Sequence, residues 1–151
     1  MKNAGDKLSV RWSKETFLKD MRAKTSREIT KIGAELCSFA EKNADEVSWG
    51  RGSEYGTISF KSKSDFGMLT LFLMTSKGYI KFLINNLRQR EVPKVIIRDF
   101  LVKLESNFLR DYDKENYPVD TFEDMSELFN TMSQVEKFKQ CIEGVAYRLR
   151  Q

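Results

Sequence analysis

The spacing of the hydrophobic residues changes from a helical to a strand period near residue 45, and it returns to a helical period at Pro93. Before residue 45, apolar residues recur at steps of three and four, as on one side of an α-helix: Ile29, Ile32, Gly33, Leu36 and Ala40. Between residues 47 and 84 the period is two, which predicts β-strands. Helices before and after one block of strands favour an α+β fold over alternating β–α units.

Four segments are expected to form an antiparallel meander of three to four strands joined by short turns. In chain order, these segments are residues 47–49, 57–61, 68–74 and 79–84. Residues 57–61 alternate between polar and apolar, so Ile58 and Phe60 should face the core. Residues 68–74 are apolar on both sides, which predicts a central strand that is covered on each face.

Three long helices are expected to pack on these strands, at residues 25–43, 93–108 and 133–150. Thr25 and Glu28 have the spacing of a capping box, and so do Ser133 and Glu136. Pro93 suits the first turn of the middle helix because its missing N–H is not needed there. Six side chains of this pattern are predicted to be buried: Phe60, Leu71, Phe82, Phe100, Phe138 and Ile142.

The 151 residues contain no internal repeat, low-complexity tract or linker rich in Gly, Ser or Pro. We therefore expect a single α+β domain at residues 13–151, preceded by a flexible segment at residues 1–12. The chain begins with polar residues, and its longest apolar-rich stretch, residues 68–74, is far shorter than the roughly 20 residues of a membrane span. No membrane partner is expected, and the cytoplasm is the expected compartment.

Few residue types are available for catalysis. The chain has no His and only two Cys, which removes the commonest general base and a structural zinc site of four Cys or His ligands. Cys37 and Cys141 fall on apolar faces of predicted helices, so both are predicted to be core residues. We therefore expect no metal and no cofactor, and enzymatic activity ranks third, behind the two functions given below.

The net charge of +4 is unevenly distributed along the chain. Residues 1–107 carry 20 basic and 13 acidic side chains, a balance of +7, and residues 108–151 carry 6 and 9, a balance of −3. This asymmetry suits contact with a polyanion, and it also suits head-to-tail association of two copies. An ordinary charged surface accounts for it equally well.

Three glycines lie within seven residues of one segment, Trp49-Gly50-Arg51-Gly52-Ser53-Glu54-Tyr55-Gly56. Glycine in a sheet loses backbone entropy and packs no side chain, so these glycines are expected to serve a turn, a bulge or a close approach. Two interpretations stay open. In one, the segment is a structural hairpin in which Trp49 is core and Arg51 pairs with Glu54. In the other, Arg51 presents its planar guanidinium to an anionic ligand beside Trp49 or Tyr55.

This segment, followed by Ile58, Phe60 and the pair Leu71-Phe72, resembles a small bacterial and archaeal domain family of uncharacterised function. The resemblance covers roughly residues 13–150, and its best motif is the Trp-Gly-Arg-Gly turn. It implies a helix just before the turn, a sheet, a middle helix and a closing helix. The chain departs from the pattern at residues 61–63, where Lys-Ser-Lys replaces an apolar or aromatic continuation. The resemblance implies no activity.

Two functions of different classes remain. The first is a non-enzymatic module that binds nucleic acid or another polyanion at a basic, aromatic-bearing sheet edge around Arg51. Its candidate residues are Trp49, Arg51, Tyr55, Lys61, Lys63, Lys77, Tyr79 and Lys81. Lys81 faces the same way as Tyr79, so one face of the sheet would offer both charge and rings for stacking. The second is a protein-interaction or homo-oligomerisation domain in which basic and acidic parts of two chains meet.

Overall fold

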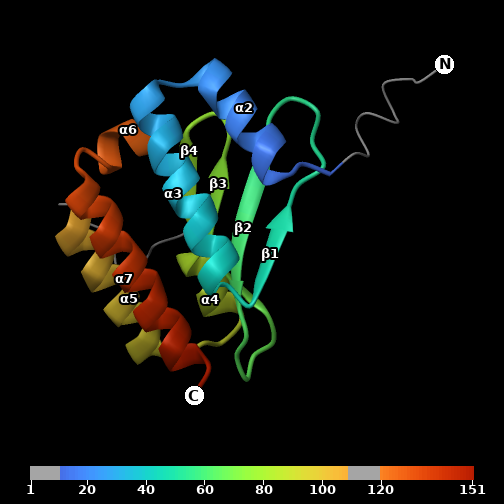
Figure 1. Cartoon of the computed structure of the whole chain (residues 1–151). Coiled ribbons are helices and arrows are strands. Elements are labelled where there is room, and N and C mark those ends of the chain that lie inside the picture. The colour runs from blue at the N-terminus through green and yellow to red at the C-terminus, as the bar shows by residue number, and fades with distance from the viewer. Residues whose placement is uncertain (1–10, 109–119) are drawn as a thin grey trace.

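Strands that are neighbours in the chain are also neighbours in the sheet, which runs in the order β1-β2-β3-β4-β5 and is antiparallel throughout. Figure 1 labels the first four of these strands. The computed structural model describes residues 11–108 and 120–151. Its elements are α2 (Lys14–Lys24), α3 (Arg27–Asn43), β1 (Glu46–Trp49), β2 (Thr57–Ser62), β3 (Leu69–Thr75), β4 (Tyr79–Phe82), α4 (Ile84–Gln89), α5 (Lys94–Phe108), β5 (Phe122–Asp124), α6 (Met125–Leu128) and α7 (Met132–Leu149). The predicted α+β class is confirmed, and the predicted three to four strands are corrected to the five of the described sheet.

The additional strand is β5, at the edge of the sheet. Phe122 lies opposite Lys81 of β4, and Asp124 lies opposite Tyr79. A strand of three residues, two of them acidic, shows too little alternation to be recognised from its own sequence. Its conformation follows from its pairing with β4, which is a long-range contact.

One face of the sheet carries the core. A row of partners across four strands on this face consists of Val47, Phe60, Phe72 and Phe82. Helix rings pack on it: Phe39 of α3 lies 5.5 Å from Phe60, and Phe138 of α7 lies 5.2 Å from Phe72, between ring centroids. Phe108 of α5 stacks on Phe82 at 5.9 Å. All six side chains predicted to be buried are at most 1% exposed, so the predicted core is confirmed.

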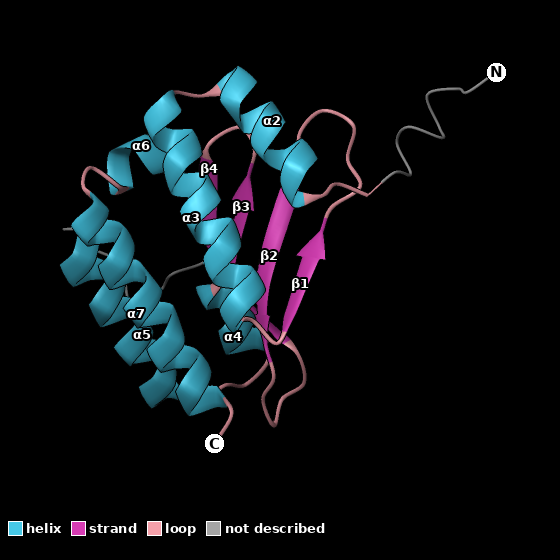
Figure 2. Ribbon diagram, viewed as in Figure 1, coloured by secondary structure: helices cyan, strands magenta, loops and turns pink. Residues whose placement is uncertain are grey.

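The opposite face of the sheet, called the open face below, is solvent-exposed. A row of partners across all five strands on this face consists of Ser48, Ser59, Leu73, Lys81 and Phe122. Each of these side chains is at least partly exposed. The prediction that β3 is covered on both faces is therefore wrong at Leu73, because the rings of α3, α5 and α7 all pack on the other side. Figure 2 shows these helices beside the sheet.

The start of α3 lies one residue beyond the predicted capping box. Ser26 is the N-cap, and its hydroxyl accepts from the backbone N–H of Ile29 at 3.1 Å. Thr25 instead ends α2, where its hydroxyl donates to the carbonyl of Met21 at 2.7 Å. Thr25 and Ser26 could both have capped α3. Because Thr25 is the C-cap of α2, Ser26 is the N-cap of α3.

The start of α7 is shifted in the other direction. Thr131 is its N-cap, and Thr131 and Gln134 bond to one another's backbone as a capping box. The predicted box of Ser133 and Glu136 lies two residues later in the same helix. Gln completes such a box as well as Glu does, so the sequence offered both pairs.

The predicted strand 79–84 ends at Phe82, and the short helix α4 follows it. The carboxylate of Asp120 accepts from the backbone N–H of Asn85 at 2.7 Å and of Asn86 at 3.2 Å. A helix of six residues has too few turns to show a helical period, and its first turn is stabilised from a distant part of the chain. None of the helices in residues 11–108 and 120–151 is both long and apolar enough to cross a bilayer.

Candidate functional site

The glycine-rich loop between β1 and β2 is fixed by Trp12. The backbone N–H of Trp12 donates to the carbonyl of Gly50 at 2.9 Å, and its indole Nε1–H donates to the carbonyl of Gly52 at 2.6 Å. Trp12 was placed in the flexible segment 1–12, whereas the structure packs it against the domain. Residues 1–10 of that segment lie outside the described residues.

Two glycines of the loop are needed for close approach within the chain. A Cβ at Gly50 would lie 2.1 Å from Oγ1 of Thr57, and a Cβ at Gly56 would lie 2.7 Å from the indole of Trp12. Gly52 has ordinary space, since its nearest atom would be the carbonyl oxygen of Tyr55 at 3.5 Å. The expectation that the glycines serve geometry is therefore confirmed for Gly50 and Gly56.

Replacing Gly56 by alanine should destabilise the domain by about 1–3 kcal/mol, because the new methyl group overlaps the ring of Trp12. Gly52→Ala is the matched control, and its free energy of unfolding should change by about 0.5 kcal/mol or less. Urea unfolding followed by far-UV circular dichroism measures both. Equal effects of the two substitutions would mean that Trp12 does not cover Gly56 in solution.

The candidate residues Trp49 and Arg51 have different environments: Trp49 is on the core face of the sheet, and Arg51 is on the exposed loop. Trp49 is opposite Ile58 on the core face, and its ring meets the edge of Phe17 at 5.8 Å. Trp49 is therefore a packing residue and is absent from the open face. Arg51 is exposed on the loop, four residues before Tyr55.

A hollow of about 220 Å³ lies where this loop meets the turn between β3 and β4. We call it the aromatic hollow; its lining residues are Tyr55, Thr75, Lys77, Tyr79 and Phe122. Gly78 forms the turn with φ +90°, a left-handed conformation that favours glycine. The structure thus brings together the candidates Tyr55 and Tyr79, which are 24 residues apart in the sequence.

The two walls of the aromatic hollow are joined by hydrogen bonds between residues 56 and 76. The hydroxyl of Ser76 accepts from the N–H of Gly56 at 2.8 Å and donates to Asp20 of α2 at 2.5 Å. The N–H of Ser76 donates to the carbonyl of Gly56 at 2.9 Å. Because Tyr55 precedes Gly56 and Lys77 follows Ser76, these bonds hold Tyr55 beside Lys77.

Two cations lie over rings at the hollow. Lys77 Nζ lies 5.2 Å from the ring centroid of Tyr55, and Lys81 Nζ lies 4.2 Å from that of Phe122. Both distances are within the range of cation–π attraction. The site therefore places positively charged groups within about 5 Å of planar aromatic rings.

The candidates Lys61 and Lys63 lie toward the other end of β2, roughly 20 Å along a six-residue strand from the loop of Tyr55. Lys61 is on the open face and pairs with Glu46 at 3.7 Å. Lys63 is exposed just beyond the strand, and its backbone N–H donates to Asp45 Oδ2 at 2.7 Å. That bond, with Arg150, holds the pKa of the Asp45 carboxyl below its usual value.

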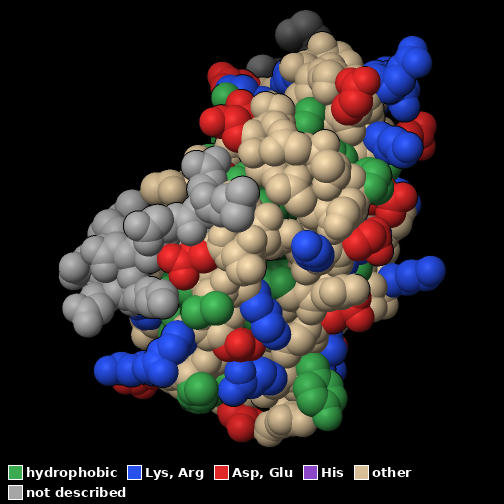
Figure 3. Space-filling view, turned by 90° about the vertical axis from the view of Figure 1, so that its left-hand side faces the viewer, with side chains coloured by type: hydrophobic (Ala, Val, Ile, Leu, Met, Phe, Trp, Pro, Cys, Tyr) green, Lys and Arg blue, Asp and Glu red, His purple; other side chains and the backbone are tan. Residues whose placement is uncertain are grey.

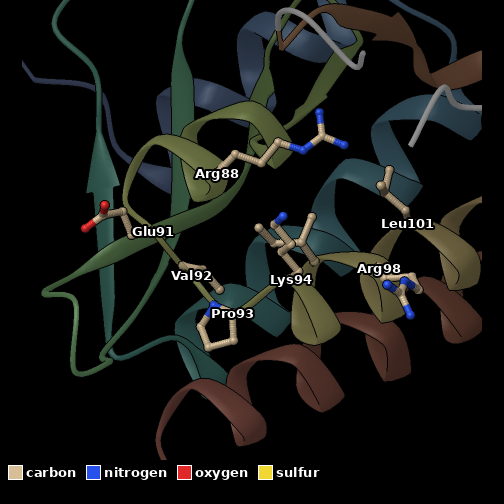
Figure 4. Close-up of a pocket in the computed structure, with 8 residues that line it drawn as sticks. Arg88, Glu91, Val92, Pro93, Lys94, Arg98 and Leu101 are labelled. Carbon is tan, nitrogen blue, oxygen red and sulfur yellow. The ribbon is translucent and has the colours of Figure 1, made fainter. Parts of the chain in front are cut away.

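A larger hollow of about 920 Å³ lies beside α4 and α5 (Figure 4). Its lining residues are Arg88, Glu91, Val92, Pro93, Lys94, Ile97, Arg98 and Leu101. Three of these side chains are cationic and one is acidic, and none has a hydroxyl, a thiol or an aromatic ring. This second basic surface can attract anions, but its lining has no hydroxyl or thiol and no aromatic ring on which a planar group would stack.

The two thiols are buried, as predicted. Cys37 and Cys141 are at most 4% exposed, and burial raises the pKa of each thiol to about 12. A thiol with such a pKa is almost entirely protonated at neutral pH and is a poor nucleophile. Within residues 11–108 and 120–151, no three His, Cys, Asp or Glu side chains are grouped so as to hold a metal ion.

The sequence prediction omitted two residues of the aromatic hollow, Thr75 and Phe122. Only the pairing of Phe122 with Lys81 shows that its ring reaches the open face. Thr75 is buried at the end of β3 and contributes to the floor of the hollow.

Comparison of the chain with protein-family models, with curated proteins and with solved structures gives no match. The resemblance through the Trp-Gly-Arg-Gly turn stays a prediction.

Proposed function

We propose that this domain is a non-enzymatic module that binds nucleic acid as a polyanion through the open face of its sheet. The observation that carries the proposal is the aromatic hollow with Lys77 and Lys81 over its rings. Arg51 and Lys61 extend the proposed surface along the loop and along β2. Trp49 is left out because its ring packs on the core face.

The charges on the open face support contact with phosphates. Neither Lys77 nor Lys81 forms an ion pair with a described residue. Of the acids on this face, Asp124 accepts from the N–H and the hydroxyl of Ser126, and Glu46 pairs with Lys61. Hydrogen bonds leave the charge of Asp124 in place, so one acid lies opposite Tyr79, beside the cations of Lys77 and Lys81. Phosphate neutralisation supplies most of the affinity of non-specific nucleic-acid binding, and these two lysines are the groups that would supply it here.

The test compares two double variants that each remove two positive charges. Lys77→Gln with Lys81→Gln should weaken binding of a labelled oligonucleotide of about 20 nucleotides by about tenfold. Lys94→Gln with Arg98→Gln, at the larger hollow, is the matched control and should change the affinity by about twofold or less. Fluorescence anisotropy measures binding, and thermal unfolding checks that each variant folds.

Two results of this comparison would contradict the proposal. If the α5 variant loses more affinity than the sheet variant, the basic surface beside α4 and α5 is the binding site. If the wild-type chain binds no oligonucleotide more tightly than about 0.1 mM at physiological salt, a common limit for non-specific binding, the domain does not bind nucleic acid.

The alternative is self-association or binding of another protein. Val95 and Val102 favour it, since they are 55% and 43% exposed and lie seven residues apart on one side of α5. Against it, Figure 3 shows Lys, Arg, Asp and Glu side chains intermingled on the α5 and α7 side, with hydrophobic side chains only in small groups. A stable interface usually buries about 800 Å² per partner with an apolar centre. Sedimentation analysis of the free protein decides: a dimer would support the alternative.

A further inference from the structure

Two rings on the open face are exposed although the core lies on the other side of the sheet. Tyr79 is 40% exposed and Phe122 is 45% exposed. Tyr55 adds a third ring from the loop, and all three line the aromatic hollow. Lys77 and Lys81 lie over the rings of Tyr55 and Phe122, so a stacked partner would use Tyr79 and the ring faces that these cations leave open.

The backbone positions that carry the rings are fixed before any partner binds. Phe122 is directly opposite Lys81, and Tyr79 is two residues from Lys81 on the same face. Tyr79 and Phe122 are therefore diagonal neighbours on paired strands, about 7 Å apart at Cβ. The hydrogen bonds between Gly56 and Ser76 fix the loop that carries Tyr55. Little loop ordering therefore remains to oppose binding.

The size of the aromatic hollow limits what it accepts. Its volume of about 220 Å³ is below the ~300–1,000 Å³ of pockets that enclose a drug-sized ligand. One planar ring system fits this space, and a whole nucleotide does not. The cations at Lys77 and Lys81 then lie beside the ring system, where the phosphates of a nucleotide chain extend past the base.

We propose that the aromatic hollow binds one unpaired base of a single-stranded nucleic acid, with Lys77 and Lys81 on the flanking phosphates. This inference rests on the proposed function and adds the substrate class. Bases of a duplex have their faces covered by neighbouring bases, so they cannot stack on Tyr79 and Phe122. Stacking on exposed rings beside cations is how proteins bind single strands without reading their sequence.

The first experiment leaves the protein unchanged and removes the bases. The wild-type chain is titrated against oligothymidine, oligouridine, an abasic strand of equal length, a duplex and heparin. Oligothymidine and oligouridine should bind about tenfold more tightly than the abasic strand and the duplex, since each stacked base contributes about 1–3 kcal/mol. Equal affinity for the normal and abasic strands would overturn the inference.

The second experiment removes the rings. Tyr79→Leu with Phe122→Leu should weaken oligothymidine binding about tenfold and leave heparin binding unchanged, because leucine keeps apolar volume but has no stacking face. Tyr79→Phe keeps the ring and should bind as the wild type does. Tyr147→Leu is the matched control, since Tyr147 is 64% exposed on α7, outside the hollow.

The outcomes separate this inference from the proposed function. If oligothymidine, the duplex and heparin all bind alike and the leucine variant has no effect, the base site is absent while the polyanion surface remains. If the leucine variant loses oligothymidine and heparin equally while it unfolds at the wild-type temperature, the rings support the surface and do not stack a base. If nothing binds, heparin included, the proposed function itself is wrong.

Discussion

Phe138→Ala is expected to destabilise the domain by about 3–5 kcal/mol, the usual cost of deleting a fully buried phenylalanine ring. Phe138 has no exposed surface. Its ring contacts four others, at centroid distances of 5.2 to 6.1 Å: Phe72, Phe82, Phe108 and Phe129. These rings come from β3, β4, α5 and the end of α6, so the resulting cavity lies where the helices meet the sheet and cannot collapse onto one mobile side chain. Urea unfolding measures the loss.

The control for Phe138→Ala is Tyr147→Ala on the same helix. Tyr147 is 64% exposed, so its replacement should change the free energy of unfolding by about 0.5 kcal/mol or less. Both substitutions remove an aromatic ring from α7 and place an alanine there, which makes their helix propensities comparable. A loss below about 1 kcal/mol at Phe138 would show that the ring cluster is not the centre of the core.

The fold class followed from the sequence because its signals are local. The change from a period of 3.6 to a period of 2 depends only on neighbouring residues, and it placed β1, β2 and β3 within a residue or two of their observed bounds. β5 and α4 were missed for the opposite reason. β5 is stabilised by pairing with β4, and the first turn of α4 by the carboxylate of Asp120, both distant in sequence.

The candidate site was predictable in part. Tyr79 and Lys81 are two residues apart on one strand, so their shared face followed from the strand period alone. The same rule places Trp49 on the side of Val47, which is apolar, and applying it to β1 would have assigned Trp49 to the core. Phe122 could not be found in this way, because its place beside Lys81 depends on the register between two strands 40 residues apart.

The loop around Arg51 shows a further limit of reading geometry from glycines. Glycines do indicate that something approaches the backbone closely, but not what approaches it. Here the approaching groups are Thr57 and the indole of Trp12, both from the chain itself. The loop is thereby fixed, and the consequence for binding is that it carries Tyr55 to the edge of the aromatic hollow.

The affinity for single-stranded nucleic acid is expected to fall about twentyfold when monovalent salt rises from about 50 to about 200 mM, if three lysines neutralise phosphates. The three are Lys61, Lys77 and Lys81, which lie on the open face or at its edge. Arg51 lies on the glycine-rich loop and is not counted among them; a phosphate contact from it would add about −0.7 to the slope of every variant below. Each phosphate contact on a single strand adds about −0.7 to the slope of log affinity against log salt, which gives about −2 for three contacts. Anisotropy titrations at four or more salt concentrations measure this slope.

The slope should change in a defined way when the lysines at the hollow are removed. With Lys77→Gln and Lys81→Gln only one of the three lysine contacts remains. The slope should therefore become less steep, about −0.7, and the same rise in salt should lower the affinity only about threefold. The control pair Lys94→Gln and Arg98→Gln should keep the wild-type slope, because those side chains line the hollow beside α5. Stacking of the base on Tyr79 and Phe122 is uncharged and therefore persists at high salt. A wild-type affinity that does not depend on salt would mean that apolar contacts hold the partner. That behaviour is expected of the self-association alternative, and it would contradict a surface that binds phosphates.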